Sequence, residues 1–319
     1  MTPGKSNLKI LITGGSGLLA GRLILLLSEN NIVTTLSRKN LDNIFNNKSI
    51  NIKKYKSFKN LEKVIGDSDV IIHASGPNAS DCNNSDIVSA YYNETKYLID
   101  IASKSKCVKK FIFLSSIRAV SDNCKGIVTE NTNLNPSSEY GKLKCSIEHN
   151  LLIDKNETDM TKIVLRITNG YGVPASLITN CWDLVVFNVC KQAIENKKII
   201  LKSKGEGYKD FIPISAVTNV IKSIISDTEY RKSDIFNVSS SKSIQVIDFI
   251  KLIKDKISKK LSTRIPIETG NLEEGKEHNV FTVDNSKITN EGWLNSYIDH
   301  EKEMDDLVEF CLKYKEKII

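Results

Sequence analysis

Tyr140 and Lys144 are two side chains whose types and spacing suit proton transfer in a redox reaction. Residues i and i+4 lie on one face of a helix, so both point the same way if this stretch is helical. A free tyrosine titrates near about pH 10, and a neighbouring ammonium stabilises its phenolate. Tyr140 can then exchange a proton with an alcohol or ketone as a hydride moves, and Lys144 can also hold a nicotinamide ribose. In a lysine-rich chain, the spacing alone can arise by chance.

Ser116 is the third candidate for this chemistry. It follows the apolar stretch 110–115, which predicts a strand, and sheets of this kind bind ligands at the carboxyl ends of their strands. A hydroxyl there can hydrogen-bond the substrate oxygen on which Tyr140 acts. A serine that caps the following turn is the structural alternative.

A glycine-rich turn follows the first apolar run, with the pattern T-G-x-x-G-x-x-A over residues 13–20. Gly14 permits a sharp turn, and Gly17 lets a pyrophosphate approach the N-terminus of the next helix, where free N–H groups favour anions. The alternative is an ordinary glycine-rich turn, but its place between a strand and a helix favours a dinucleotide site. The predicted cofactor contacts in this turn are Gly14, Ser16, Gly17, Leu18 and Leu19.

The second apolar run ends in Ser37-Arg38-Lys39. An acidic residue near this point binds the ribose hydroxyls of NAD, whereas an arginine accommodates the 2′-phosphate of NADP. Arg38, with Ser37 and Lys39 beside it, therefore favours NADP(H), and NAD(H) stays possible. A solvated surface arginine is the alternative.

Short apolar runs alternate with helical stretches in the first half of the chain. The expected strands are 8–13, 32–36, 50–54, 69–73, 110–115 and 162–166, and the expected helices include 17–30 and 85–105. This alternation is typical of a parallel sheet covered on both faces. The predicted fold class is α/β, a doubly wound parallel Rossmann sheet with a smaller mixed α/β substrate lobe.

The rhythm changes after about residue 170. Helices are expected at 175–196, 215–227, 245–259 and 299–315, strands at 198–202, 235–238 and 264–267, and a surface loop at 268–279. We therefore expect a dinucleotide-binding domain over 1–170 and a substrate-binding lobe over 171–319, part of which returns to the first domain.

Composition excludes several classes of protein. The net charge is +7, but the lysines are spread along the chain, so a nucleic-acid polymer is not an expected partner. No apolar run is long enough to span a bilayer and the start shows no secretory signal, which predicts a cytoplasmic protein without a membrane partner. The seven cysteines form no C-x-x-C pair and the four histidines lack metal-ligand spacing, so free thiols and no metal are expected.

The motifs, taken in order, resemble the extended short-chain dehydrogenases/reductases, in particular the NAD(P)-dependent nucleotide-sugar epimerase/dehydratase group. The resemblance covers nearly the whole chain. It is carried by the glycine turn, by residues 69–75, 93–95 and 115–116, by Tyr140-x-x-x-Lys144, and by residues 165–172 and 205–213. It implies further cofactor contacts at Ala74, Ser75, Gly76, Asn93, Ser115 and Thr168. It also implies substrate contacts at Ser116, Arg118, Asn169, Asn180 and Lys209, and a homodimer built on the helices that carry Asn93 and Tyr140.

The departures from this group narrow the expected reaction. Ile117-Arg118 follows Ser116, where the sugar 4,6-dehydratases of the group carry an acidic pair, so dehydration is not expected. Lys209 replaces an arginine and cannot make the same bidentate grip on phosphate. The first hypothesis is an NADPH-dependent reductase of a 4-keto nucleotide sugar. The alternatives are a nucleotide-sugar epimerase with transiently reduced bound NAD(P), and a non-catalytic Rossmann sensor, against which the intact Ser116, Tyr140 and Lys144 speak.

Overall fold

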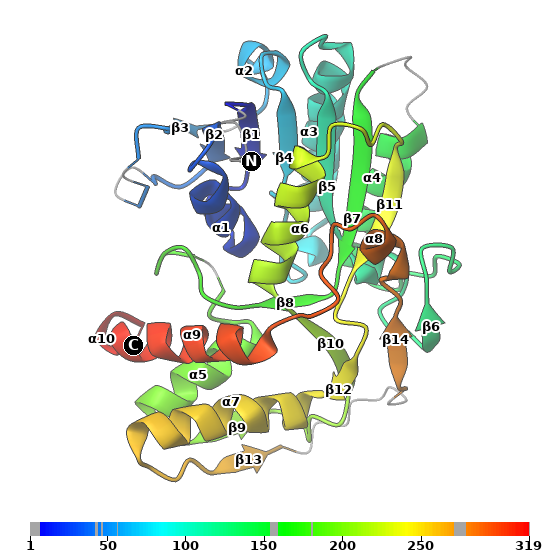
Figure 1. Cartoon of the computed structure of the whole chain (residues 1–319). Coiled ribbons are helices and arrows are strands. Elements are labelled where there is room, and N and C mark those ends of the chain that lie inside the picture. The colour runs from blue at the N-terminus through cyan, green and yellow to red at the C-terminus, as the bar shows by residue number, and fades with distance from the viewer. Residues whose placement is uncertain are drawn as a thin grey trace.

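A seven-stranded parallel sheet forms the centre of the molecule (Figure 1). The computed structural model describes residues 7–41, 44–45, 47–55, 57–153, 159–179, 181–270 and 279–318. The strand order is β11-β7-β5-β4-β1-β2-β3. The strands are β1 (Lys9–Thr13), β2 (Ile32–Ser37), β3 (Ile50–Lys54), β4 (Val70–His73), β5 (Lys110–Ser116), β7 (Thr161–Ile167) and β11 (Asp234–Val238). This arrangement confirms the predicted doubly wound α/β fold.

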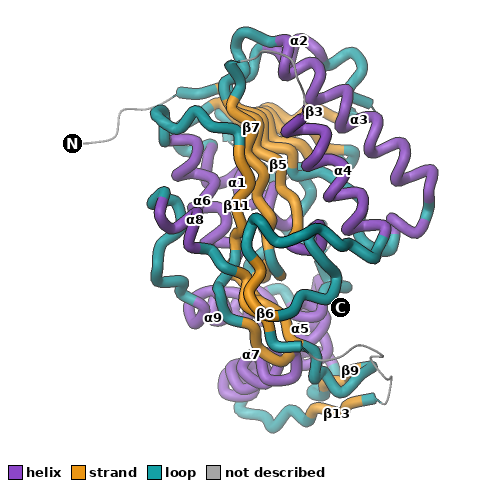
Figure 2. Tube along the Cα trace, turned by 90° about the vertical axis from the view of Figure 1, so that its right-hand side faces the viewer, coloured by secondary structure: helices purple, strands orange, loops and turns teal. Residues whose placement is uncertain are grey.

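Helices cover both faces of this sheet, as Figure 2 shows with the sheet seen edge-on. One face packs against α1 (Leu18–Leu27), α6 (Ile214–Ser226) and α8 (Ser286–Asn290). The other packs against α2 (Glu62–Gly66), α3 (Ser85–Lys104) and α4 (Glu139–Ile153). The central strands are buried on both faces, which explains why their sequences are continuous apolar runs rather than alternating ones.

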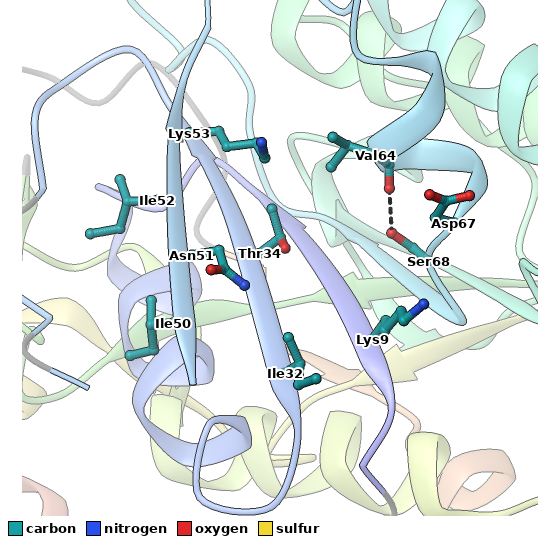
Figure 3. Close-up of a pocket in the computed structure, with 10 residues that line it drawn as sticks. All are labelled: Lys9, Ile32, Thr34, Ile50, Asn51, Ile52, Lys53, Val64, Asp67 and Ser68. Carbon is teal, nitrogen blue, oxygen red and sulfur yellow. Dashed lines mark hydrogen bonds between the residues drawn. The ribbon is translucent and has the colours of Figure 1, made fainter. Parts of the chain in front are cut away.

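The edge strand β3 is the exception, because its sequence alternates. Figure 3 shows Ile50 and Ile52 on one side of the strand and Asn51 and Lys53 on the other. The two isoleucines pack against the core below α1, while Asn51 and Lys53 are exposed. The exposed side borders a polar hollow between β1, β2 and α2, which extends to Lys9 at the start of β1. This hollow therefore lies toward the amino ends of the strands, away from the predicted cofactor turn.

A second lobe carries its own apolar core. Its helices are α5 (Val185–Glu195), α7 (Val246–Leu261), α9 (His300–Lys313) and α10 (Lys315–Ile318). Its strands are β8 (Asn169–Tyr171), β10 (Tyr208–Pro213) and β12 (Ser243–Gln245) in one sheet, and β9 (Ile199–Leu201) and β13 (Ile267–Thr269) in another. Beside the large sheet, β6 (Gly126–Val128) pairs with β14 (Phe281–Val283). Two single turns complete the described elements, η1 (Asp81–Asn83) and η2 (Ile117–Ala119).

The segment after residue 171 crosses between the two parts of the chain more than once. Helix α6 packs against α1, and β11 pairs with β7, although both follow the expected boundary. The long helix expected over 175–196 is wrong in its first half, because α5 begins only at Val185. Arg22 and Lys39 donate hydrogen bonds to the carbonyls of Val173 and Ile178. The stretch 173–178 is therefore bound to α1 and to the end of β2 and does not form a helix.

Candidate active site

The turn between β1 and α1 lies so close to Ser75 that position 14 has no room for a side chain. Gly14 has a φ of +77°, and a Cβ atom there would lie 2.7 Å from the Cα of Ser75. The N–H groups of Gly14 and Gly15 both donate to the carbonyl of Leu36 at the end of β2. Gly17 precedes α1 without a side-chain cap, so the first N–H groups of the helix are available to an anion.

A buried polar cluster supports this turn from the side of β4. The Oγ1 atom of Thr13 accepts hydrogen bonds from the N–H groups of Ala74 and Ser75, each at 3.1 Å. His73 lies beneath them, with Nδ1 2.9 Å from Thr13 Oγ1 and Nε2 3.0 Å from the Tyr91 hydroxyl. Tyr91 in turn donates to the carbonyl of Ser75 at 2.6 Å. These contacts fix the chain from 74 to 76 against the glycine turn.

A cavity of about 270 Å³ opens where these loops meet the carboxyl ends of the strands. It lies between the start of α1, the ends of β4, β5 and β7, and the first turn of α4. Of the predicted residues, the cavity is lined by Gly17, Leu18, Leu19, Ala74, Ser75, Gly76, Ser115, Ser116, Tyr140, Lys144 and Thr168. The predicted contacts did not include its remaining walls, which are Ala20, Pro77, Leu114, Ile167, Gly170 and Ile214. Most of these are apolar, a character that they share with any core position.

Ser116, Tyr140 and Lys144 come together at one wall of this cavity. Ser116 and Tyr140 both line this wall, and the Ser116 side chain lies close enough to lower the pKa of the Tyr140 phenol. Lys144 lies on the next turn of α4, with Nζ 5.7 Å from the centroid of the Tyr140 ring and 3.0 Å from the carbonyl of Leu114, to which it donates. Helix α4 can approach the turn η2 this closely because Gly141 has no side chain, since a Cβ there would lie 2.5 Å from the Arg118 carbonyl oxygen. The three side chains, whose types suit proton transfer, therefore lie together at this wall of the cavity.

The surroundings of Tyr140 and Lys144 determine which forms they adopt. Burial raises the pKa of Tyr140, and the Ser116 hydrogen bond and the Arg118 charge offset this only in part, so the phenol holds its proton at neutral pH. Burial lowers the pKa of Lys144 to about 8, against an opposing effect of the Glu148 carboxylate. We expected Lys144 to provide the cation that stabilises the phenolate. In the structure, Arg118 is the cation that lowers the pKa of Tyr140.

Ser115 and Arg166 belong to a buried network behind the cavity. The Ser115 hydroxyl donates to Glu148, and Arg166 donates to both Glu148 carboxylate oxygens, the shortest contact being 2.7 Å. Glu148 lies one helical turn beyond Lys144 on α4. The network therefore ties the helix that carries Tyr140 and Lys144 to β5 and β7.

The predicted substrate contacts lie in different places. The Asn169 side chain donates to the Asp210 carbonyl at 2.9 Å, and the neighbouring Thr168, which was predicted as a cofactor contact, donates to the Asp210 carboxylate at 2.7 Å, so both are held by β10. Lys209 is exposed on β10 and does not line the cavity, and Asn180 lies outside the described residues. Arg118 lies at Tyr140, with its guanidinium 5.2 Å from the ring centroid.

Asn93 and the Ser37–Lys39 segment also lie apart from the cavity lining. Asn93 is exposed on α3, and Tyr91, two residues earlier, is the side chain of that helix that reaches the chain at 75. Arg38 and Lys39 are exposed at the end of β2, and the buried Ser37 hydroxyl accepts from the Lys39 N–H. Burial raises the pKa of the Tyr55 phenol, and the Ser75 side chain and the Arg38 charge oppose this rise, so Tyr55 lies near both residues, a neighbourhood that was not predicted. Ser16 lies within the glycine turn but does not line the cavity.

Two further properties of the described residues bear on the class of protein. None of their helices combines the length and the apolar character that crossing a membrane requires. In the same residues, no three His, Cys, Asp or Glu side chains gather as ligands for a metal ion.

A parallel Rossmann sheet with a glycine turn, Ser116, and Tyr140 and Lys144 on one helix defines a dinucleotide-binding enzyme fold. The family model described as "NAD dependent epimerase/dehydratase family" matches residues 10–239. The chain therefore belongs to this family.

Individual relatives are distant. The chain is 23% identical over 265 residues to the uncharacterized UDP-glucose epimerase YtcB of Bacillus subtilis, a match that covers 78% of this chain and 82% of the relative. It is 24% identical over 290 residues to the UDP-glucose 4-epimerase of Dictyostelium discoideum, covering 81% and 83%. Among solved structures, the UDP-glucuronic acid 4-epimerase of Bacillus cereus, in complex with UDP-glucuronic acid and NAD, superposes with a TM-score of 0.80. That match covers 98% of this chain and 100% of the other at 20% identity, which establishes the shared fold.

Proposed function

We propose that this protein is an NAD(P)-dependent oxidoreductase that acts on a nucleotide-activated sugar, and that its reaction is the NADPH-dependent reduction of a 4-keto group. The observation that carries the proposal is that the Tyr140 phenol lines one cavity together with Ser116, Lys144 and the glycine turn. The phenol is an acid placed where a carbonyl oxygen needs a proton.

The protonation state of Tyr140 suits the reduction of a carbonyl group. The raised pKa of Tyr140 keeps the proton on the phenol, which suits donation to a ketone better than removal of a proton from an alcohol. Ser116 can donate a hydrogen bond to the same carbonyl oxygen, and Lys144 can hold the ribose next to the reacting ring. The glycine turn and Lys144 would hold NAD(P)H, which would supply the hydride for the carbonyl carbon, and Tyr140 would give its proton to the carbonyl oxygen. The products are the alcohol and NAD(P)⁺.

Dehydration is disfavoured by the residues that follow Ser116. Ile117 is buried and Arg118 is cationic, so neither supplies the carboxyl groups that water elimination uses in the dehydratases of this group. For the cofactor, the end of β2 offers Arg38 and Lys39 to a 2′-phosphate, and the described residues 37–41 carry no carboxylate for a ribose diol. This composition supports NADP(H) over NAD(H).

A nucleotide-sugar epimerase is the second candidate, and the relatives favour it. Two of them are named UDP-glucose epimerases, and the Bacillus cereus neighbour is a 4-epimerase in complex with NAD. An epimerase would use the same Ser116, Tyr140 and Lys144 to oxidise and then re-reduce one sugar carbon. It differs from a reductase in that no cofactor is consumed.

The test is to incubate the purified protein with NADPH or NADH and a panel of 4-keto and 4-hydroxy nucleotide sugars. Stoichiometric loss of NADPH with the keto sugars is the expected result. Interconversion of sugars without net cofactor change would establish the epimerase instead, and turnover of none would favour a non-catalytic sensor.

Tyr140→Phe tests the role of the phenol in the same assay. It should lower kcat by about a hundredfold or more, the usual contribution of a general acid, and leave cofactor binding unchanged. Tyr297→Phe is the matched control, because this tyrosine is 72% exposed. Wild-type turnover by Tyr140→Phe would refute the mechanism. The predicted homodimer is tested separately, by light scattering of the same sample.

A further inference from the structure

Two cations lie close to the ring of Tyr140. The Cζ atom of Arg118 is 5.2 Å from the ring centroid, and the Nζ atom of Lys144 is 5.7 Å from it. Lys144 comes from the same helix, α4, whereas Arg118 comes from η2, the turn that follows Ser116. The phenol is thus approached by a second positive charge from a separate element.

Asp122 holds this second charge in place. The Arg118 Nε atom donates to the Asp122 carboxylate at 2.6 Å. The same carboxylate accepts hydrogen bonds from the N–H and hydroxyl groups of both Ser137 and Ser138, at distances of 2.7 to 3.0 Å. Burial disfavours a charge on Asp122, but the hydrogen bonds from Ser138 and Arg118 outweigh it and lower the pKa of Asp122. A charged carboxylate therefore links η2 to the residues just before Tyr140.

Asp122 binds the Nε atom of Arg118, so the rest of the guanidinium group can act on its surroundings. No hydrogen bond joins its Nη groups to another residue in the described part of the chain, and the side chain is 40% exposed. A guanidinium over an aromatic face is attracted by the ring, and it favours a negative charge on the phenol oxygen. Arg118 lies in η2, which directly follows Ser116 at the end of β5.

We propose that Arg118, anchored by Asp122, is a positioning residue that stabilises the negative charge which Tyr140 gains as its proton leaves. This inference rests on the proposed redox function for the step in which that charge arises. Among the described residues, the ionisable groups that face the phenol are Lys144 on α4, Arg118 on η2, Cys82 on η1 and Tyr91 on α3. Cys82 and Tyr91 carry no positive charge, so Arg118 and Lys144 are the cations of this set.

The experiment measures the ionisation of Tyr140 without any sugar. The phenolate absorbs in the near ultraviolet, so the difference in absorbance between the wild type and Tyr140→Phe, with NAD⁺ bound, gives the titration midpoint of this one tyrosine. The same difference is then measured in the Arg118→Gln background. A neighbouring cation lowers a phenol's midpoint, and solvent screens a cation that is 40% exposed, so Arg118→Gln should raise the midpoint by up to about one pH unit. Arg118→Lys, which keeps the charge, should recover part of the shift.

Arg264→Gln is the control, because Arg264 is an exposed arginine of the second lobe, and its midpoint should equal that of the wild type. An unchanged midpoint in a folded Arg118→Gln protein would overturn the proposal. If that variant does not fold, a midpoint in Arg118→Lys above that of Arg264→Gln still supports the proposal. With a sugar that is turned over, the pH dependence of kcat should shift together with the titration midpoint of Tyr140, while KM stays constant. A raised KM without any such shift would make Arg118 a substrate contact instead. If no sugar is turned over, the proposed function fails but the titration still decides the role of Arg118.

Discussion

Thr13 and His73 are direct neighbours across β1 and β4, and Thr13 Oγ1 lies 2.9 Å from His73 Nδ1. Because Thr13 Oγ1 already accepts from two N–H groups, its one proton is directed to Nδ1. Tyr91 gives its proton to the carbonyl of Ser75, so the Tyr91 oxygen at 3.0 Å and Thr95 Oγ1 at 3.1 Å are the acceptors available to Nε2–H. This pattern assigns the neutral Nε2–H tautomer to His73.

Stability should fall in acid because of His73. Burial, with a smaller contribution from the Lys144 charge, lowers the pKa of His73 to about 3 in the folded protein. As pH falls below about 6.5, the unfolded chain takes up a proton that the folded chain refuses, which costs about 1.4 kcal/mol of unfolding free energy per pH unit. Urea unfolding across this range measures the slope. His73→Gln should reduce it, exposed His149→Gln should not, and equal slopes in His73→Gln and wild type would contradict the assignment.

Much of the fold was predictable, because the buried strands and the glycine turn depend on local sequence. The apolar runs before Gly14 and Ser116 predicted β1 and β5, and a helix with i, i+4 spacing predicted that Tyr140 and Lys144 face one way. What could not be predicted depends on contacts across the fold. The role of Tyr91 rather than Asn93 in reaching Ser75 depends on the rotation of α3 against β4, which no local pattern encodes.

The Glu148–Arg166 pair should contribute strongly to stability when one partner is removed. Both side chains are nearly fully buried, and Glu148→Gln would leave the Arg166 charge without its carboxylate. Breaking a buried pair in this way costs about 3–5 kcal/mol, which urea unfolding at neutral pH would show as a lower midpoint. Glu139→Gln breaks the exposed pair with Lys142 on the same helix and should cost about 1 kcal/mol or less. Similar losses in the two variants would be inconsistent with this account.

Cofactor preference should depend on Arg38. The side chain is exposed at the end of β2, where a 2′-phosphate would meet it. A hydrogen bond to a charged group contributes about 1.5–3 kcal/mol, so Arg38→Ala should weaken NADPH binding by about tenfold or more and affect NADH little. Calorimetric titration with both cofactors measures the ratio, and exposed Arg231→Ala serves as the control. Equal losses for NADPH and NADH would mean that Arg38 does not read the phosphate.

Gly14 and Gly126 allow the backbone strain of the cofactor turn to be separated from its crowding. Both have a positive φ, +77° and +59°, so alanine is strained at either position by about 1–2 kcal/mol. Only Gly14 is also crowded, because its Cβ would lie 2.7 Å from Ser75 Cα, whereas nothing lies within 4 Å of a Cβ at Gly126. Gly14→Ala should therefore destabilise the protein by about 1–3 kcal/mol more than Gly126→Ala, as urea unfolding would show.

Gly14→Ala should also lose dinucleotide affinity. The turn must move to relieve the contact between the new Cβ and Ser75, and this movement displaces it from the first N–H groups of α1. Gly126→Ala should bind NADPH as the wild type does, and equal affinities in the two variants would show that the approach of Gly14 to Ser75 does not shape the phosphate site.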